Sequence, residues 1–380
     1  MINLNQAATT WPKPACVTEA MTAAFSAPPP GQFRSGAGGD GADVMEDTRQ
    51  QLADLLGIGN PGRVFFASGA TDAANALIRG LPLAGRRVLA SQTEHNSVLR
   101  PLMNLRRHVG KVDIIPCDEN GTVSPEAVSA MLEDPAAAVF ISHCSNVTGA
   151  IQDLAAIGEI VHRKGAMLVV DVAQSAGCLP VGVDAWGVDA LIVTGHKGLF
   201  GPQGIGAYYV RPGLTLEPFR YGGTGRNSSQ LLYSPEDYEY EPGTQNLPGI
   251  AALGAGIRWC LSAGVENIAK QERRLIARLR DGLRSLPGVH VYANGLSETG
   301  PVLSFTLAGL SPADLAYILS GTYDIRVRAG LHCAPLIHRA LGTENGGTLR
   351  VSVSALTREA EIDQFLCAMG EIAAAQEVRS

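Results

Sequence analysis

The chain has 380 residues, 46% of them hydrophobic and 17% charged, with a formal net charge of −6. This acidic balance argues against nucleic acid as a partner, because phosphate backbones are bound through surplus Lys and Arg. No apolar run approaches the roughly 20 residues of a bilayer span, and the first residues lack a secretory pattern. We therefore expect a soluble, cytoplasmic protein with no membrane partner, long enough for a large domain and a smaller one.

Short apolar runs recur between residues 63 and 210 and alternate with stretches of helical spacing. The runs are RVFFAS, RRVLAS, VDIIPC, AAVFIS, AMLVVDVA, ALIVT and GIGAYYV, and the helical stretches include 71–80, 97–108, 124–133 and 153–164. Continuous apolarity is typical of strands that are buried on both faces. The pattern predicts an α/β fold, in which a mainly parallel seven-stranded sheet carries helices on both faces.

The sequence changes character after about residue 250, where long helical stretches appear and are followed by shorter strand and helix units. This change predicts a large domain of residues 15–255 and a smaller α+β domain of residues 1–14 and 256–380. The Pro- and Gly-rich stretch at 26–43 is predicted to be a loop, which is either flexible or ordered by a ligand or a second subunit.

Polar side chains follow several of the predicted strands, at the edge where parallel α/β sheets bind ligands. Lys197 follows ALIVT and is a surface residue, a phosphate-binding cation or an amine that forms a Schiff base. Asp171 ends an apolar strand, where a carboxylate needs a structural arginine, another cation or a protonated ring nitrogen.

Three further positions extend this pattern. The segment SGAT precedes a predicted helix, so the helix start can bind a phosphate, or Thr71 can simply cap it. His95 can stack on a flat ring or be an ordinary core histidine, and Asn146 offers an amide. Together these groups provide what pyridoxal phosphate requires: an amine, an acid for its ring nitrogen, a phosphate cradle and a stacking partner.

The motifs TEHNSVL, SHCSNVTG, DVAQSAG, TGHKGLFGPQGIGAYYVR, EPGTQNLPGIAAL and RAGLHCAP resemble, in order and spacing, the class V aminotransferase group of fold-type I pyridoxal-phosphate enzymes. More narrowly they resemble the cysteine desulfurase and selenocysteine lyase family. The resemblance covers nearly the whole chain. It implies the fold-type I architecture, pyridoxal 5'-phosphate as cofactor, Lys197 as the Schiff-base lysine and Asp171 as the partner of the ring nitrogen.

The resemblance also implies the other contacts to the cofactor. His95 would stack on its ring, Gln174 would bind its phenolic oxygen with Asn146 near the same edge, and its phosphate would be held near Ala70 by Thr71, Thr194 and His196. Thr244 would reach the phosphate of a neighbouring subunit, which implies a homodimer with shared sites. Residues 219–229 and 31–41 would then lie near that interface. No metal site is implied.

Cys333 restricts the set of reactions that the resemblance implies, because a cysteine at this position in the family takes sulfur from the substrate and carries it as a persulfide. Arg328 and His332 are expected to stabilise its thiolate. Arg350 would bind the substrate carboxylate, and Asn146 and Arg328 would also contact the substrate. The alternative is an inert buried thiol beside a structural arginine. We expect Lys197, Cys333, His95 and Asp171 to be catalytic.

The resemblance implies that cysteine is converted to alanine. Selenocysteine, a transamination, an epimerisation or a C–S cleavage that releases sulfide are the alternatives on the same scaffold, and a nucleotide- or partner-binding protein is the alternative outside it. The cysteine loop is short and carries Leu331 where related short-loop sequences often have a second His. A short loop reaches fewer acceptors unaided, so a sulfur-acceptor protein is a further expected partner.

Overall fold

The structure is a computed structural model that describes residues 1–27, 40–105, 109–223, 229–232 and 240–378. The loop predicted at 26–43 falls largely on residues outside this set, as do parts of 31–41 and 219–229. Its last four residues belong to helix α2 (Asp40–Leu56), so that part of the loop prediction is wrong. Helix α2 packs against helix α8 (Leu247–Ala263), and this packing outweighs the low helix propensity of Gly41.

The predicted seven-stranded sheet is confirmed. Its order is β2-β8-β7-β6-β5-β3-β4, and only β8 runs against the other six strands. The strands are β2 (Val64–Ala67), β3 (Val88–Ser91), β4 (Val112–Ile115), β5 (Ala138–Ser142), β6 (Met167–Asp171), β7 (Ala190–Thr194) and β8 (Gly206–Val210). Most are buried along their whole length, as continuous apolarity predicts.

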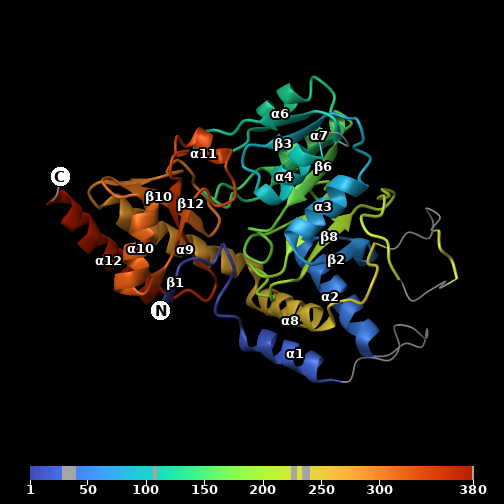
Figure 1. Ribbon diagram of the computed structural model, residues 1–380, viewed down its shortest axis with the longest axis horizontal. Helices are drawn as coiled ribbons and strands as arrows, with labels where there is room; N and C mark the ends of the chain where they lie inside the picture. Colours follow the sequence, from blue (N-terminus) through green and yellow to red (C-terminus); the bar gives the residue numbers. More distant parts are fainter. Residues whose placement is uncertain (28–39, 106–108, 224–228, 233–239, 379–380) are drawn as a thin grey trace.

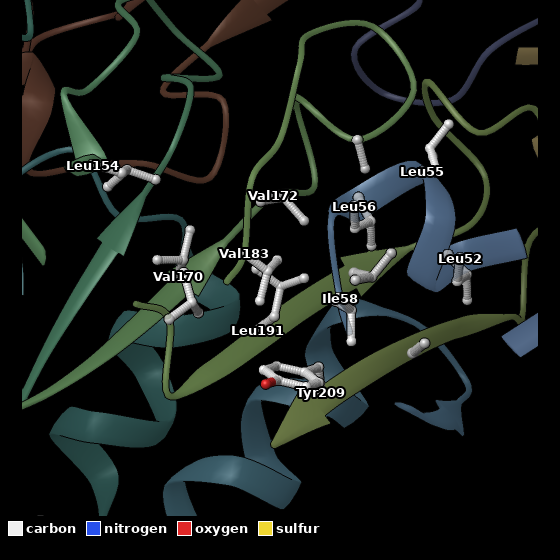
Figure 2. Close-up of a cluster of buried hydrophobic side chains, with 14 of the residues drawn as sticks. Leu52, Leu55, Leu56, Ile58, Leu154, Val170, Val172, Val183, Leu191 and Tyr209 are labelled. Atoms are coloured by element: carbon white, nitrogen blue, oxygen red, sulfur yellow. The ribbon is translucent and has the colours of Figure 1, made fainter. Parts of the chain in front are cut away.

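Alternate side chains of this sheet enter two hydrophobic cores, one on each face. Leu191 and Val193 of β7 pack with α2, α8, α6 (Pro125–Met131) and α7 (Leu154–Arg163). Ala190 and Ile192 of the same strand pack with α3 (Ala70–Gly80) and α4 (Asn96–Asn104). Figure 2 shows part of the first core, a cluster that contains Leu52 and Leu56 of α2 and Leu191 of β7. Helices on both faces hold the strand ends rigidly in place.

A second sheet lies beside the first (Figure 1), with the antiparallel order β12-β13-β10-β9. Its strands are β9 (Val289–Val291), β10 (Val302–Leu307), β12 (Arg328–Gly330) and β13 (Thr348–Ser352). A third core joins it to α9 (Val265–Arg284), α10 (Pro312–Tyr323) and α12 (Glu359–Glu377). The division into domains at residues 14 and 255 stays a prediction.

Several shorter elements complete the chain: α1 (Ala15–Ser26), the 3₁₀ turn η1 (Pro61–Arg63), α11 (Ile337–Ala340), and the parallel pair β1 (Ile2–Asn3) and β11 (Ile325–Arg326). β1 and β11 form a separate two-stranded sheet, and an isolated bridge between Asn5 and Ser352 of β13 joins the N-terminal segment to the second sheet. From there the segment runs toward the carboxyl ends of the large sheet. Among the described residues, none of the helices has the length and hydrophobicity needed to cross a bilayer.

Candidate active site

A cavity of about 580 Å³ opens at the carboxyl edge of the large sheet, where that sheet faces β12 and β13. Eleven of the predicted site residues line it: Ala70, Thr71, His95, Asn146, Asp171, Gln174, Thr194, His196, Lys197, Arg328 and Arg350. Cys333 lines an adjoining groove. Thr244 is exposed on the loop before α8 and lines neither space.

Lys197 stands in the turn that follows β7, and its amine lies inside the cavity. The pKa of Lys197 is lowered to about 8, mainly because the amine is buried; the charge of Asp171 raises this pKa, whereas Arg350 and Arg328 lower it. A substantial fraction of this amine is therefore neutral near physiological pH. Since a neutral amine is the nucleophilic form, the surface-residue alternative for Lys197 is wrong and the nucleophile alternative is consistent with the geometry.

Asp171 is the last residue of β6, and its Oδ1 accepts a hydrogen bond from the backbone N–H of Ala173 at 2.8 Å. Burial raises the pKa of Asp171, whereas Lys197 is the cation that lowers it. Among the described residues no arginine forms an ion pair with Asp171, so the structural-arginine alternative is not realised. A buried carboxylate in this position can bind a protonated ring nitrogen.

Glu94 is a fully buried acid that our sequence analysis did not single out. It accepts hydrogen bonds from the hydroxyls of Ser91 at 2.7 Å and Ser142 at 3.1 Å. Burial and the neighbouring charge of Asp171 raise the pKa of Glu94 to about 7. The available signal was its position beside His95 at the end of a strand, where a carboxylate is costly without partners.

One end of the cavity carries unsatisfied polar groups around the start of α3. Thr194 Oγ1 and His196 Nδ1 are buried, and neither has a hydrogen-bond partner among the residues that the structure describes. Gly69 precedes α3 with φ of 141°, a conformation that essentially only glycine adopts, and no side chain caps the helix. Thr71 is the second residue of the helix, so the alternative that it acts as the cap is wrong. The free N–H groups and these side chains can hold a phosphate.

His95 caps α4 by accepting the N–H of Ser97 on Nδ1 at 3.0 Å, which fixes its ring at the cavity wall. Burial, reinforced by Lys197 and Arg328, lowers the pKa of His95 to about 3, so the imidazole is neutral. Gln174 Nε2 donates to the carbonyl of Ala7 at 3.1 Å. The neutral imidazole of His95, held by the N–H of Ser97, can stack on a planar ligand.

Two arginines form the opposite wall. Arg328 of β12 and Arg350 of β13 are register partners, and no carboxylate in the described part of the chain pairs with either. Burial and the charge of Arg328 lower the pKa of Arg350 to about 9. The Nε of Arg350 is buried without a partner. Arg350 already donates to the carbonyl of Asn146 at 2.9 Å and to Oδ1 of Asn5 at 3.3 Å. Guanidinium groups placed in this way can bind a carboxylate.

Cys333 follows β12 and lies beside Arg328, whose Nη2 donates to Sγ at 3.2 Å. His332 and Cys333 both have left-handed backbones, with φ of 50° and 60°. The loop is held by Asn146, whose amide donates to the carbonyl of His332 at 2.7 Å, and by the N–H of Asn96, which donates to the carbonyl of Cys333 at 2.7 Å. Contacts from the large sheet thus hold a backbone that is unfavourable for these residues.

The expectation that His332 helps to stabilise the thiolate is wrong. Its Nε2 is hydrogen-bonded to Thr348 Oγ1 at 3.0 Å, and its side chain is buried. Burial, together with Arg350, lowers the pKa of His332 to about 2, so its ring carries no charge to offer a thiolate. Arg328 is the cation that contacts Cys333. Sequence adjacency suggested His332, but the left-handed turn directs its ring elsewhere.

The N-terminal segment also holds the lysine turn, a role that sequence reasoning missed. Thr10 Oγ1 donates to the carbonyl of Lys197 at 2.9 Å, and the N–H of Thr10 donates to the carbonyl of His196 at 3.1 Å. Lys13 Nζ donates to the same His196 carbonyl at 3.2 Å. The stretch NQAATT, residues 5–10, was the sequence signal for this role. It extends from Ser352 of the second sheet to the cavity, which Ala7 and Ala8 line.

The fold and the site together define a class of α/β protein with an amine, an acid and an anion cradle at one edge of its sheet. The Aminotransferase class-V family model matches residues 2–365. This chain therefore belongs to the class-V aminotransferase family, as the sequence motifs predicted.

Comparison with individual proteins and solved structures identifies a narrower group of relatives within this family. The chain is 32% identical to a probable cysteine desulfurase of Methanothermobacter thermautotrophicus, over 97% of this chain and 94% of that protein. It is 31% identical to a cysteine desulfurase of Klebsiella pneumoniae, over 86% and 82%. The apo structure of a cysteine desulfurase from Thermococcus onnurineus NA1 superposes with a TM-score of 0.87 at 30% identity, covering 98% of this chain and 95% of that one.

Proposed function

We propose that this protein is a pyridoxal-phosphate-dependent cysteine desulfurase, which converts L-cysteine to alanine and leaves the sulfur on Cys333. One observation carries the proposal most directly. The amine of Lys197 and the buried acid Asp171 line the same cavity as Arg328, and Arg328 contacts the thiol of Cys333. The cysteine desulfurases among its relatives support the same reading. No observation favours transamination or a nucleotide-binding role over it.

The residues at the phosphate end of the cavity fit the cofactor. A phosphate there would satisfy Thr194 Oγ1 and His196 Nδ1, which have no partner, and the free N–H groups at Ala70 and Thr71. His95 would cover the ring, Asp171 would bind its nitrogen, and Gln174 and Asn146 would lie along its edge. When bound, pyridoxal phosphate supplies an aldehyde that condenses with amines and a ring that withdraws electrons from the substrate α-carbon.

The chain's own groups then handle the substrate and its protons. Arg350, with Arg328 beside it, binds the carboxylate of cysteine. The neutral Nζ of Lys197 removes the α-proton, and Asp171 keeps the ring nitrogen protonated. Sγ of Cys333 forms a bond to the substrate sulfur while the carbon–sulfur bond breaks. The carbon that loses sulfur receives a proton, so the products are alanine and a persulfide on Cys333.

We also propose that the enzyme is a cytoplasmic homodimer that passes sulfur to an acceptor. Thr244 supports the dimer, because it is exposed on a loop outside its own cavity and is thereby available to the phosphate site of a second copy. Cross-linking or light scattering at working concentration measures this assembly. A monomer with full activity would contradict the shared site.

The function is tested by product analysis. Enzyme loaded with pyridoxal phosphate is given L-cysteine, and alanine, pyruvate and sulfur on the Cys333 peptide are measured. We expect alanine and one added sulfur atom on Cys333, and borohydride should attach the cofactor to Lys197. Pyruvate in place of alanine would indicate a lyase, and an unmodified Cys333 with full turnover would overturn the persulfide.

A further inference from the structure

A second hollow of about 410 Å³ lies on the outer side of Cys333, between helices α3 and α4. Thr71, His95 and Ser97 line both this groove and the main cavity, so the two spaces meet at these residues. Cys333 lines the groove. We call this space, lined also by Arg79 and Arg100, the outer groove. Its volume is that of a small-molecule site.

The outer groove is basic in a protein whose net charge is −6. Arg79 of α3 and Arg100 of α4 are its two ionised side chains, and no acidic residue lines it. Neither guanidinium has a carboxylate within ion-pair distance among the described residues, in contrast to Arg87 and Arg220, which pair with aspartates. Arg79 also lies over the ring of Phe219, at 5.9 Å from its centroid. Two arginines on facing helices, with no carboxylate partner in the described part of the chain, make the groove suited to an anion.

The backbone of Cys333 is held at this groove by a hydrogen bond. The N–H of Asn96 at the start of α4 donates to the carbonyl of Cys333 at 2.7 Å, which ties the cysteine to the helix that carries Arg100. Arg328 approaches Sγ from the side of the main cavity. Cys333 therefore lines the outer groove while its Sγ contacts an arginine of the main cavity.

We propose that the outer groove binds a small thiol that carries carboxylates, and that this thiol takes the sulfur from Cys333; the proposal rests on the function proposed above. The thiolate of the acceptor attacks the outer sulfur of the persulfide. A sulfur–sulfur bond forms on the acceptor, the bond between Sγ and the outer sulfur breaks, and Sγ leaves as a thiolate. No other reductant is consumed. Arg79 and Arg100 hold the acceptor carboxylates while its sulfur reaches Cys333.

A first experiment tests the groove without turnover. Cys333 in the holoenzyme is alkylated with iodoacetate and, in parallel, with iodoacetamide, and the ratio of the two rates is measured on the Cys333 peptide. Replacing both arginines, Arg79→Gln with Arg100→Gln, should lower this ratio roughly threefold to tenfold, because steering of an anion is lost. The control pair Arg86→Gln with Arg284→Gln removes the same charge from exposed sites elsewhere and should keep the wild-type ratio.

A second experiment tests the acceptor. Holoenzyme loaded from ³⁵S-labelled cysteine is challenged with mercaptosuccinate, 2-mercaptoethanol or cysteamine at equal thiolate concentration, and label release is scored per loaded enzyme. Mercaptosuccinate should release sulfur roughly tenfold faster than the neutral thiol, with saturation, and the Arg79→Gln/Arg100→Gln variant should lose this preference.

The outcomes separate this proposal from the proposed function. Failure to load label would overturn the persulfide, while the alkylation ratio would still report on the groove. An alkylation ratio unchanged in the double variant would overturn the anion site. Equal release by all three thiols, or fast release only to an acceptor protein, would overturn the small acidic thiol as the ligand.

Discussion

The two walls of the cavity are built differently. The cofactor wall, which comprises Asp171, Thr194, His196 and Lys197, stands on the ends of β6 and β7, inside a sheet that is packed on both faces. The thiol wall comprises Arg328, Cys333 and Arg350, and its cysteine sits on a left-handed turn held by residues of the other sheet. One wall depends on rigid strands, whereas the other depends on contacts across the interface between two sheets. Damage to each should therefore have a distinct signature.

The largest effect is expected from the cofactor wall. Lys197→Ala removes both the amine that attaches the cofactor and the base, and alanine formation should fall at least about 1,000-fold. Lys111→Ala is the control, because Lys111 is exposed and paired with Asp113 far from the cavity. Alanine release by chromatography measures the effect. Activity within tenfold of wild type would contradict the role of Lys197.

A change in the thiol wall should reduce sulfur transfer without loss of cofactor binding. Cys333→Ala is expected to lower sulfur transfer by about 100-fold or more, because the sulfur has no acceptor thiol, while borohydride still attaches the cofactor to Lys197. Cys367→Ala replaces an exposed cysteine of α12 and serves as the control. Loss of cofactor binding in Cys333→Ala would show that the two walls are not separable.

The phosphate end of the cofactor wall can be weakened by one methyl group. Gly69→Ala places a side chain on a backbone with φ of 141°, at a cost of about 1–3 kcal/mol, so the affinity for pyridoxal phosphate should fall roughly 10- to 100-fold. Gly85→Ala also alters a left-handed glycine, but one with open space around it and far from the cavity. Equilibrium dialysis should find cofactor affinity reduced by the first change alone.

The pH dependence of cofactor uptake sharpens the assignment of Lys197. The pKa of its amine is lowered to about 8, so the reactive neutral fraction should rise about tenfold between pH 6 and pH 7 and level off above pH 8. The rate at which apoenzyme takes up added pyridoxal phosphate measures this fraction. If the uptake rate continued to rise beyond pH 10, burial would not lower the pKa of this amine.

A buried acid outside both walls should affect stability alone. Burial raises the pKa of Glu272 well above its usual range, and one carboxyl oxygen has no partner. Its contribution to stability is greatest below the unfolded pKa and is lost as the pH rises toward the folded pKa. Glu272→Gln should therefore raise the free energy of unfolding by about 1–3 kcal/mol at pH 8, with little change at pH 4. Denaturant titration at both pH values measures the difference.

Much of the cofactor wall could be predicted, because its residues directly follow apolar strands. Asp171 and Lys197 were expected at the same edge of the sheet, and the structure places both in one cavity. Glu94 was missed because nothing local shows that it points toward Asp171. His332 was expected to stabilise the thiolate of Cys333 because the two residues are adjacent in sequence. The left-handed backbone at both residues directs the imidazole away from the thiol.

The large sheet, the family and the chemical groups of the site could all be predicted from the sequence, because buried strands and the turns that follow them leave local patterns. Tertiary structure alone decided how Asn146 and Asn96 hold the cysteine loop, how Thr10 holds the lysine turn, and how Arg79 and Arg100 come to flank one groove. Most of these contacts join residues far apart along the chain. The hydrophobic periodicity of the sequence does not indicate such contacts, since they arise from the packing of one element against another.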